Sequence, residues 1–183
     1  MNYYVEIKTL SDLETTAPTL MNHLCSKLHR QLGQMKQNRI GISFPKVKKT
    51  LGDTLRLHGT DDDLYQLMQA DWLGSLRGYV RCSDVCLIPS TVTYRTVRRV
   101  QIKSMHNKRQ RSIAKGWLTR EEAMQKMPDH LERAIDLPFL QFRSLSTKQV
   151  MRVYIEHGEI TRETALGSFS SYGLSSTAKV PWF

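Results

Sequence analysis

Apolar residues in the first third of the chain follow two spacings, one typical of strands and one typical of helices. Residues 3–8 are rich in β-forming side chains and predict a strand. A helix is predicted from the proline-containing start at residues 16–18 to Gly33, because leucine recurs at every fourth position between them. Residues 39–45 and 51–58 carry alternating apolar positions and predict two further strands.

A second helix and a fourth strand complete this half of the chain. Residues 60–63 begin with threonine and continue with three aspartates, which favours a helix start because carboxylates stabilise the positive end of the helix dipole. Residues 85–88 predict a strand that ends at Pro89. Strand, helix, strand, strand, helix, strand is the order of the ferredoxin-like, or RRM-like, fold, which hosts many functions.

The remaining half is expected to be α+β as well. Residues 91–103 look extended, residues 105–116 predict a basic helix, and residues 119–122 resemble a capping box that opens a short helix. Residues 137–143 and 149–156 predict strands. The predicted class is therefore α+β, with a ferredoxin-like domain at residues 1–93 and a smaller α+β domain, carrying an arginine/lysine-rich helix, at residues 94–183.

Positive charge is concentrated in one segment. The 183-residue chain has a formal net charge of +10, and residues 85–120 contain nine lysines and arginines and no acidic residue. Such a field usually attracts a phosphate backbone, although a solvated basic surface is the alternative. The hydrophobic fraction of 40% is that of an ordinary globular protein.

Several other classes of protein are disfavoured. The sequence has no apolar run long enough to span a membrane and no secretory signal at its start. Three unpaired cysteines, Cys25, Cys82 and Cys86, fit a reducing cytoplasm. Cys82 and Cys86 are spaced like two metal ligands, but no further cluster completes a site, so we expect no metal and no cofactor.

Two features could carry chemistry. His29 falls at the edge of the leucine stripe of the first helix, where it is either a packed core residue or a half-exposed, reactive imidazole. Lys108, Arg111 and Lys115, with Arg109 alongside, form a cationic ridge on the basic helix. The ridge suits a nucleic acid better than a membrane surface, because the helix has only a small apolar face.

Short strings along the whole chain then point to one family. They include Lys27-Leu28-His29, residues 39–45, Arg99-Val100-Gln101, residues 136–139, Arg143-Ser144 with Ser146-Thr147, residues 171–175 and residues 180–183. With these strings in this order, the chain resembles the CRISPR repeat-processing endoribonuclease of type I-F systems, a branch of the Cas-six family.

The resemblance implies a cytoplasmic, metal-independent nuclease that acts in antiviral defence. Family members cut at the 3′ base of a repeat-RNA hairpin when the adjacent 2′-hydroxyl attacks the phosphate, which leaves a 2′,3′-cyclic phosphate. By resemblance, His29 is the catalytic histidine, Ser144 orients the attacking hydroxyl and Tyr172 orients the histidine. The enzyme is expected to keep its product and to join other subunits of a guide-RNA surveillance complex.

The resemblance also makes residues 94–183 the RNA-hairpin-binding domain, with the catalytic histidine in residues 1–93, and it assigns individual residues to RNA binding. Arg99 and Gln101 match a pair that reads bases, Met151 occupies the place of a stacking aromatic, and the ridge matches an arginine-rich helix. The full set expected at the RNA is Arg99, Gln101, Lys108, Arg109, Arg111, Lys115, Ser146, Thr147 and Met151. Two other hypotheses stay open: a non-catalytic RNA-hairpin scaffold, and a DNA-binding regulator.

Overall fold

The computed structural model describes residues 1–101, 105–128, 135–143 and 149–183 as a mixed α/β structure with two antiparallel sheets. The chain divides into two compact units, Met1–Val100 with Leu137–Phe183, and Gln101–Asp136. The elements in order are β1 (Tyr3–Thr9), α1 (Ala17–Met35), β2 (Gly41–Ser43), β3 (Thr54–Gly59), α2 (Asp61–Gln69), the short 3₁₀ helix η1 (Gly74–Tyr79), β4 (Val80–Cys82), β5 (Cys86–Leu87), β6 (Thr93–Val100), α3 (Met105–Ala114), α4 (Arg120–Lys126), β7 (Phe139–Arg143), β8 (Val150–His157) and β9 (Lys179–Trp182).

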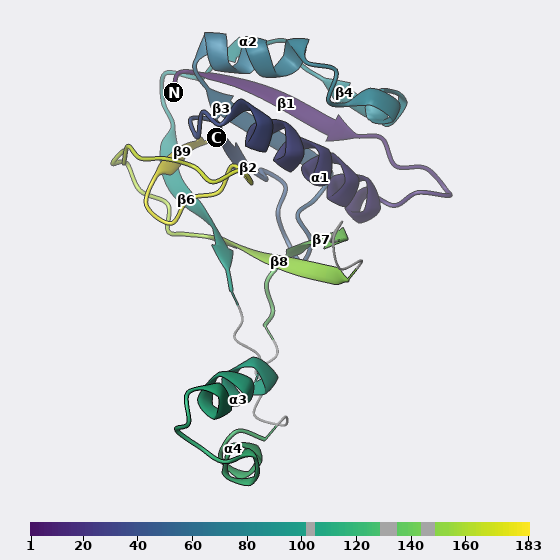
Figure 1. Ribbon diagram of the computed structural model, residues 1–183. Coiled ribbons are helices and arrows are strands. Elements are labelled where there is room, and N and C mark those ends of the chain that lie inside the picture. The colour runs from purple at the N-terminus through teal and green to yellow at the C-terminus, as the bar shows by residue number, and fades with distance from the viewer. Residues whose placement is uncertain (102–104, 129–134, 144–148) are drawn as a thin grey trace. The chain divides into compact units, whose positions relative to one another are not determined.

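The first sheet has the strand order β2-β3-β1-β4, with β5 also paired to β1 (Figure 1). All of its pairings are antiparallel. Val5 and Ile7 of β1, and Leu55 and Leu57 of β3, are fully buried and belong to one core cluster with the leucines of α1 and α2. Alternation along the strands therefore places one face of the sheet in the core.

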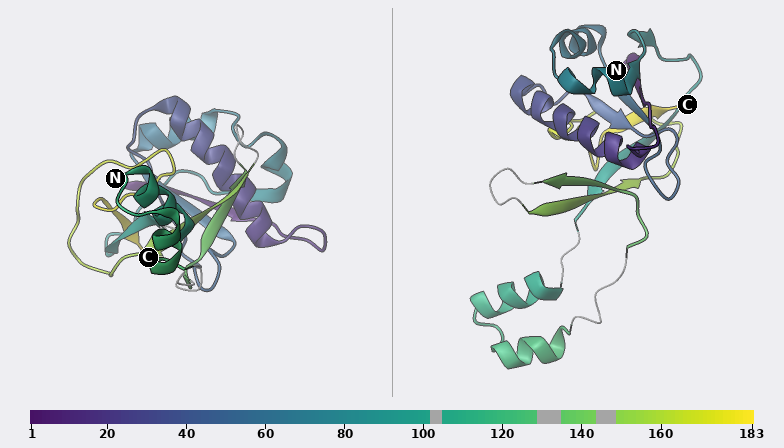
Figure 2. Two further views of the ribbon diagram at one scale, coloured as in Figure 1. Left: turned by 60° about the horizontal axis from the view of Figure 1, so that its bottom comes forward. Right: turned by 90° about the vertical axis from the view of Figure 1, so that its right-hand side faces the viewer.

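The second sheet belongs to the same compact unit and has the order β7-β8-β6-β9. β7 and β8 lie side by side (Figure 2) and pair antiparallel along the whole of β7. The backbone N–H of Gln141 in β7 donates to Oδ1 of Asn22 in α1, at 2.9 Å. This bond fixes the edge of the second sheet against the helix that packs on the first.

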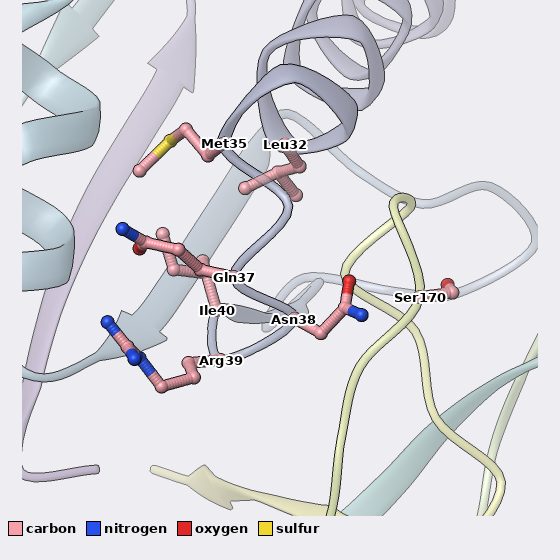
Figure 3. A pocket seen from close by; sticks show the side chains of 7 residues that line it. All are labelled: Leu32, Met35, Gln37, Asn38, Arg39, Ile40 and Ser170. Atoms are coloured by element: carbon pink, nitrogen blue, oxygen red, sulfur yellow. The ribbon is translucent and has the colours of Figure 1, made fainter.

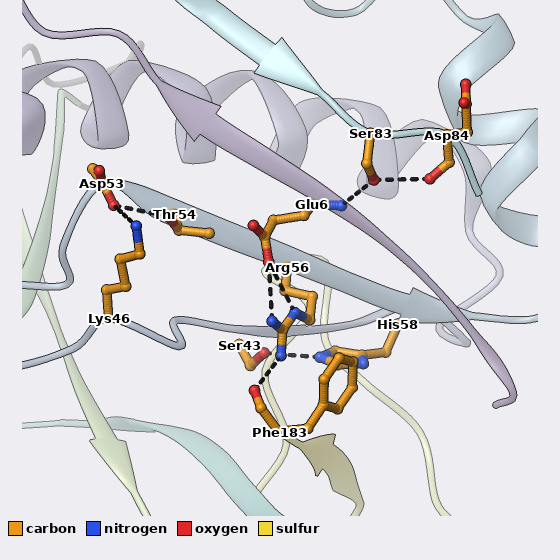
Figure 4. A network of polar contacts seen from close by, with 10 residues as sticks. All are labelled: Glu6, Ser43, Lys46, Asp53, Thr54, Arg56, His58, Ser83, Asp84 and Phe183. Carbon is orange, nitrogen blue, oxygen red and sulfur yellow. Dashed lines mark hydrogen bonds and ion pairs between the residues drawn. The ribbon is translucent and has the colours of Figure 1, made fainter. Parts of the chain in front are cut away.

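The last residue of the chain is held on the first sheet by Arg56 (Figure 4). Arg56 donates to the Phe183 carbonyl at 2.7 Å and forms an ion pair with Glu6 at 2.9 Å, and its guanidinium lies 3.9 Å from the centre of the Phe183 ring. Nearby, His58 is fully buried and shares a 2.8 Å hydrogen bond with Ser43. Burial, and then the charge of Arg56, lowers the pKa of His58 to about 3.

The second unit is a helical pair. α3 ends in a Schellman motif, in which the N–H of Trp117 donates to Ser112 O and that of Gly116, at φ +68°, donates to Ile113 O. The predicted capping box is confirmed: the Thr119 hydroxyl accepts from the Glu122 N–H, and the Glu122 carboxylate accepts from the Thr119 N–H.

Most predicted elements are confirmed, with three differences. The helix stop at Gly33 is wrong, because α1 continues to Met35 and Lys36 takes the left-handed conformation instead. The strand predicted at residues 85–88 is confirmed as β5, but β4 at Val80–Cys82, which also pairs with β1, was not expected. β9 was not expected from the sequence.

The compact units do not follow the predicted boundary between residues 93 and 94. That boundary falls at the start of β6, whose pairing with β8 and β9 keeps it in the first unit. Ser144, Ser146 and Thr147 lie outside the described residues. Among those that are described, no helix combines the length and the apolar character needed to cross a membrane.

Candidate active site

His29 lies where the leucine stripe of α1 meets a loop from the end of the chain. The stripe residues Leu28 and Leu32 are buried, whereas His29 is half-buried. Nδ1 of His29 lies 3.1 Å from the carbonyl oxygen of Ser171. Because a carbonyl oxygen only accepts, Nδ1 carries the proton in this contact, and Nε2 of a neutral imidazole is left with the lone pair.

The loop that holds this carbonyl turns at Gly173. Gly173 has φ +71°, its N–H donates to Ser170 O at 2.8 Å, and its own carbonyl accepts from the Ile42 N–H at 2.9 Å. A Cβ at this position would lie 2.6 Å from Cγ2 of Ile42. Only glycine therefore meets both the backbone angle and the close approach to β2.

The same loop is tied to the chain that follows α1. The N–H of Phe169 donates to the Asn38 carbonyl at 2.9 Å. Ser170 and Asn38 line a small pocket at the C-terminal end of α1 together with Leu32 and Arg39 (Figure 3). One end of the loop is thus bonded to the segment between α1 and β2, and the other end to β2 itself, which holds Ser171 and Tyr172 at the His29 side chain.

Tyr172 stacks on His29. The two ring centroids are 3.8 Å apart and the ring planes differ by 6°. Phe142 of β7 supports the pair, with its ring centroid 6.4 Å from that of His29 and 5.5 Å from that of Tyr172. The Ser171 carbonyl holds Nδ1 of His29 by a hydrogen bond, and the Tyr172 ring fixes the plane of the imidazole. Together the two contacts define the orientation of the His29 side chain.

A positive charge lies beside the ring pair. Arg99, near the end of β6, places its guanidinium carbon 5.8 Å from the centre of the Tyr172 ring. Its Nε atom is buried and has no hydrogen-bond partner within the described residues. A buried guanidinium donor without a partner has hydrogen-bonding capacity left for a substrate. Gln101 follows β6 directly and is exposed.

Met151 lies on the His29 side of the β7–β8 pair. It is opposite Phe142 in the register and is 36% exposed. Residues directly opposite each other in an antiparallel pair point to the same face, so Met151 extends the surface that Phe142 begins. The structure thus brings His29, Tyr172, Arg99 and Met151 to one region, with Phe142 at its centre.

The four residues of the predicted cationic ridge on α3 differ in their exposure to solvent. Lys108, Arg111 and Lys115 are exposed, and the Lys115 ammonium lies 4.3 Å from the centre of the Trp117 ring. Arg109 is only 6% exposed and donates to the Met127 carbonyl at 2.5 Å, so it joins α3 to the segment after α4. Its expected role at the RNA stays a prediction.

Sequence reasoning missed Phe142 and Gly173. Residues 137–143 were predicted to form a strand, but that prediction does not say that Phe142 contacts a histidine from α1. For Gly173, the glycine-serine composition of the loop was the available signal.

No candidate metal centre stands out. Within residues 1–101, 105–128, 135–143 and 149–183, no three His, Cys, Asp or Glu side chains gather in the arrangement of a metal site. Cys25, Cys82 and Cys86 are free thiols, and burial raises the pKa of Cys25 well above its usual range.

Comparison with known families identifies the chain. The family model described as "CRISPR-associated protein (Cas_Csy4)" matches residues 4–183. The chain belongs to this Csy4 family. Two relatives carry the name "CRISPR-associated endonuclease Cas6/Csy4": one from Escherichia coli (strain UTI89 / UPEC), 44% identical over 184 residues, and one from Pseudomonas aeruginosa (strain UCBPP-PA14), 39% identical over 187 residues. Each alignment covers 100% of this Csy4-family chain and 100% of the relative.

Two solved structures match the Csy4-family chain more distantly. A CRISPR endoribonuclease Cse3 bound to 19 nt RNA is 15% identical with a TM-score of 0.41. Thermus thermophilus Cse3, bound to an RNA representing a pre-cleavage complex, is 12% identical with a TM-score of 0.39. Both alignments cover 99% of this chain and 100% of the other.

Proposed function

We propose that this chain is a metal-independent endoribonuclease that cuts CRISPR precursor RNA at the 3′ base of each repeat hairpin and stays bound to the mature guide RNA. The observation that carries the proposal is the orientation of His29, which is set by the Ser171 carbonyl and by the stacked ring of Tyr172. A histidine that served only to fill the core would need neither a defined tautomer nor a half-exposed ring.

The cleavage step uses the free lone pair of His29. Nε2 takes the proton of the 2′-hydroxyl, O2′ forms a bond to phosphorus, and the bond between phosphorus and O5′ breaks. The product ends are a 2′,3′-cyclic phosphate and a 5′-oxygen, which becomes a hydroxyl when it receives a proton. Because the nucleophile belongs to the RNA, the reaction needs no metal-activated water. Arg99 supplies positive charge beside the ring pair.

Other parts of the proposal rest on the family resemblance. Ser144 is assigned to the attacking hydroxyl, and Ser146 and Thr147 to RNA contact. Lys108, Arg111 and Lys115 supply exposed cations to the hairpin, and Arg99, Gln101 and Met151 meet its base. The product stays bound because these contacts survive the cut, which suits a lasting cytoplasmic subunit of a type I-F surveillance complex.

The strand order supports the finer description of the fold. The succession β1-α1-β2-β3-α2-β4, with the sheet order β2-β3-β1-β4, is what a ferredoxin-like half requires. We infer that this half supplies the catalytic histidine, while the segment from residue 94 onward supplies most of the RNA contacts.

The test is cleavage of the repeat RNA from the source genome in the presence of EDTA, with analysis of both product ends. A single cut at the 3′ base of the hairpin, ending in a cyclic phosphate, supports the proposal. Tight binding without a cut favours the scaffold alternative, and preference for duplex DNA at equal salt favours the regulator.

A further inference from the structure

The β7–β8 pair has a second, outward face that carries aromatic side chains. Leu140 and Phe142 of β7 are buried, whereas Phe139, the first residue of β7, is 39% exposed. Phe139 lies opposite Tyr154 in the register, and the two ring centroids are 5.6 Å apart. The Arg152 guanidinium lies 4.7 Å from the centre of the Phe139 ring. Phe139, Arg152 and Tyr154 are called the outer platform below.

A cavity of about 270 Å³ adjoins the outer platform at Phe139. It lies between β7, the first turns of α1 and the loop before β3, and its lining includes Asn22, Lys49, Gly52 and Gln141. Among the residues that the structure describes, none of those lining the cavity is acidic. The nearest acid in sequence, Asp53, is already paired with Lys8 at 3.9 Å and with Lys46 at 3.5 Å. Lys49 is exposed and has no ion-pair partner in the described parts of the chain.

This combination of groups suits a single nucleic-acid strand. Aromatic rings and a guanidinium stack on bases of any sequence, and a lysine pairs with a phosphate. Since Oδ1 of Asn22 accepts the Gln141 N–H, the Asn22 amide presents its NH₂ group as a donor. The competing occupant is a protein partner with an acidic, apolar surface. RNA is favoured by the arginine stacked on Phe139, by a lining whose described residues include no acid, and by the net charge of +10.

We propose that the outer platform and the adjoining cavity bind the single-stranded RNA that flanks the repeat hairpin. The proposal rests on the proposed function, because it places the hairpin at His29. Phe142, which contacts the His29 ring pair, is three residues from Phe139 on the same strand, and this corresponds to about 10 Å. The outer platform is therefore within reach of an RNA strand that leaves the cut site.

The experiment compares the full chain's affinity for three RNAs at one salt concentration. These are the hairpin alone, the hairpin with a single-stranded 5′ extension, and the hairpin with a 3′ extension protected from cleavage by a 2′-deoxy nucleotide at the cut. We expect at least one extension to tighten binding by about tenfold, the gain typical of one or two stacked bases. Phe139→Leu and Lys49→Gln should each reduce this gain to less than about threefold without changing the affinity for the hairpin alone.

Lys48→Gln is the matched control, because it removes the neighbouring charge without touching the cavity lining and should keep the gain. Phe139→Leu retains an apolar side chain, so loss of folding does not confuse the result. If the hairpin is bound and cut but neither extension tightens binding, or if the gain survives both variants, the outer platform does not bind RNA and the proposed function stands. If the hairpin itself is neither bound nor cut, the proposed function fails first.

Discussion

The side-chain rings of His29 and Tyr172 stack on each other, although 142 residues lie between these two residues in the sequence. The histidine comes from the first long helix and the tyrosine from a loop near the end of the chain. Backbone hydrogen bonds join one end of that loop to Asn38, before β2, and the other end to Ile42 in β2. The position of the tyrosine ring is therefore set by the backbone of the loop. We infer that the C-terminal segment completes a site that the first half of the chain only begins.

Replacing His29 with alanine should abolish cleavage and spare binding. Loss of a general base lowers a rate by about 10²–10⁴-fold, whereas the exposed cations proposed to hold the hairpin are unchanged. Single-turnover cleavage and hairpin affinity, measured on the same preparation, check this. His23→Ala on the exposed side of α1 is the control and should cut at the normal rate. Normal cleavage by the His29 variant would remove His29 from the mechanism.

Tyr172 should act through its ring rather than through its hydroxyl. Tyr172→Phe keeps the 3.8 Å stack and is expected to cut within about threefold of the wild type. Tyr172→Ala loses the stack, worth about 0.5–1.5 kcal/mol, and should slow cleavage by up to about tenfold. Single-turnover cleavage rates of the two variants and of the wild type are the readout. Equal loss in both variants would assign the role to the hydroxyl.

The sequence predicts the helices and strands of this fold better than it predicts the tertiary contacts between them. Local sequence patterns predicted the body of α1, the strands β3 and β8, and the capping box at Thr119 and Glu122. β9 was missed, since it contains Pro181 and is stabilised by pairing with β6 across the chain. Gly33 was misread as a stop because the buried leucine stripe outweighs the weak helix propensity of glycine, about 1 kcal/mol.

The candidate active site shows the same contrast between local patterns, which could be predicted, and contacts between distant segments, which could not. His29 was singled out from its place on a helical wheel, which the half-buried side chain matches. Its contact with Phe142 depends on β7 lying against α1, and no local pattern encodes that. The ridge on α3 was predicted from spacing alone, and spacing cannot show that Arg109 turns toward the Met127 carbonyl.

Gly173→Ala should weaken both stability and cleavage. The left-handed backbone at φ +71° and the 2.6 Å approach to Ile42 leave no room for a methyl group, and the cost should be about 1–3 kcal/mol. The displaced loop would carry Ser171 and Tyr172 away from His29. Gly33→Ala is the matched control: it lies within α1, nothing lies within 4 Å of its added Cβ, and it should stabilise the chain by about 0.5–1 kcal/mol. Urea denaturation and cleavage rates measure the pair.

Substitution of Arg111 should weaken RNA binding, whereas substitution of Arg109 should weaken the packing of the helical pair. Arg111→Gln removes an exposed cation, so hairpin affinity should fall and the slope of log affinity against log salt should drop by about one. Arg109→Gln leaves the Met127 carbonyl without its buried donor and should loosen the packing of α3 on α4. Amide hydrogen exchange in α3 reads out the second effect. Faster exchange in the Arg111 variant, with no change in the Arg109 variant, would reverse these roles.

Stability should fall when the pH is lowered from about 7 to about 5. The pKa of His58 is about 3 in the folded chain, where burial and Arg56 oppose protonation, against about 6.5 for an exposed histidine. The unfolded chain therefore binds a proton that the folded chain excludes, and the free energy of unfolding drops by about 2 kcal/mol over this interval. His157, whose pKa burial and Arg95 lower to about 4, acts in the same direction.

Urea denaturation of the wild type and of His58→Gln across this interval tests the assignment. The variant should be less stable at neutral pH, because the buried contact with Ser43 is altered, but its stability should depend less steeply on pH. His106→Gln removes a histidine that is exposed on α3 and should leave the slope unchanged. An equally steep dependence in the His58 variant would place the acid sensitivity elsewhere, in the carboxylates or in His157.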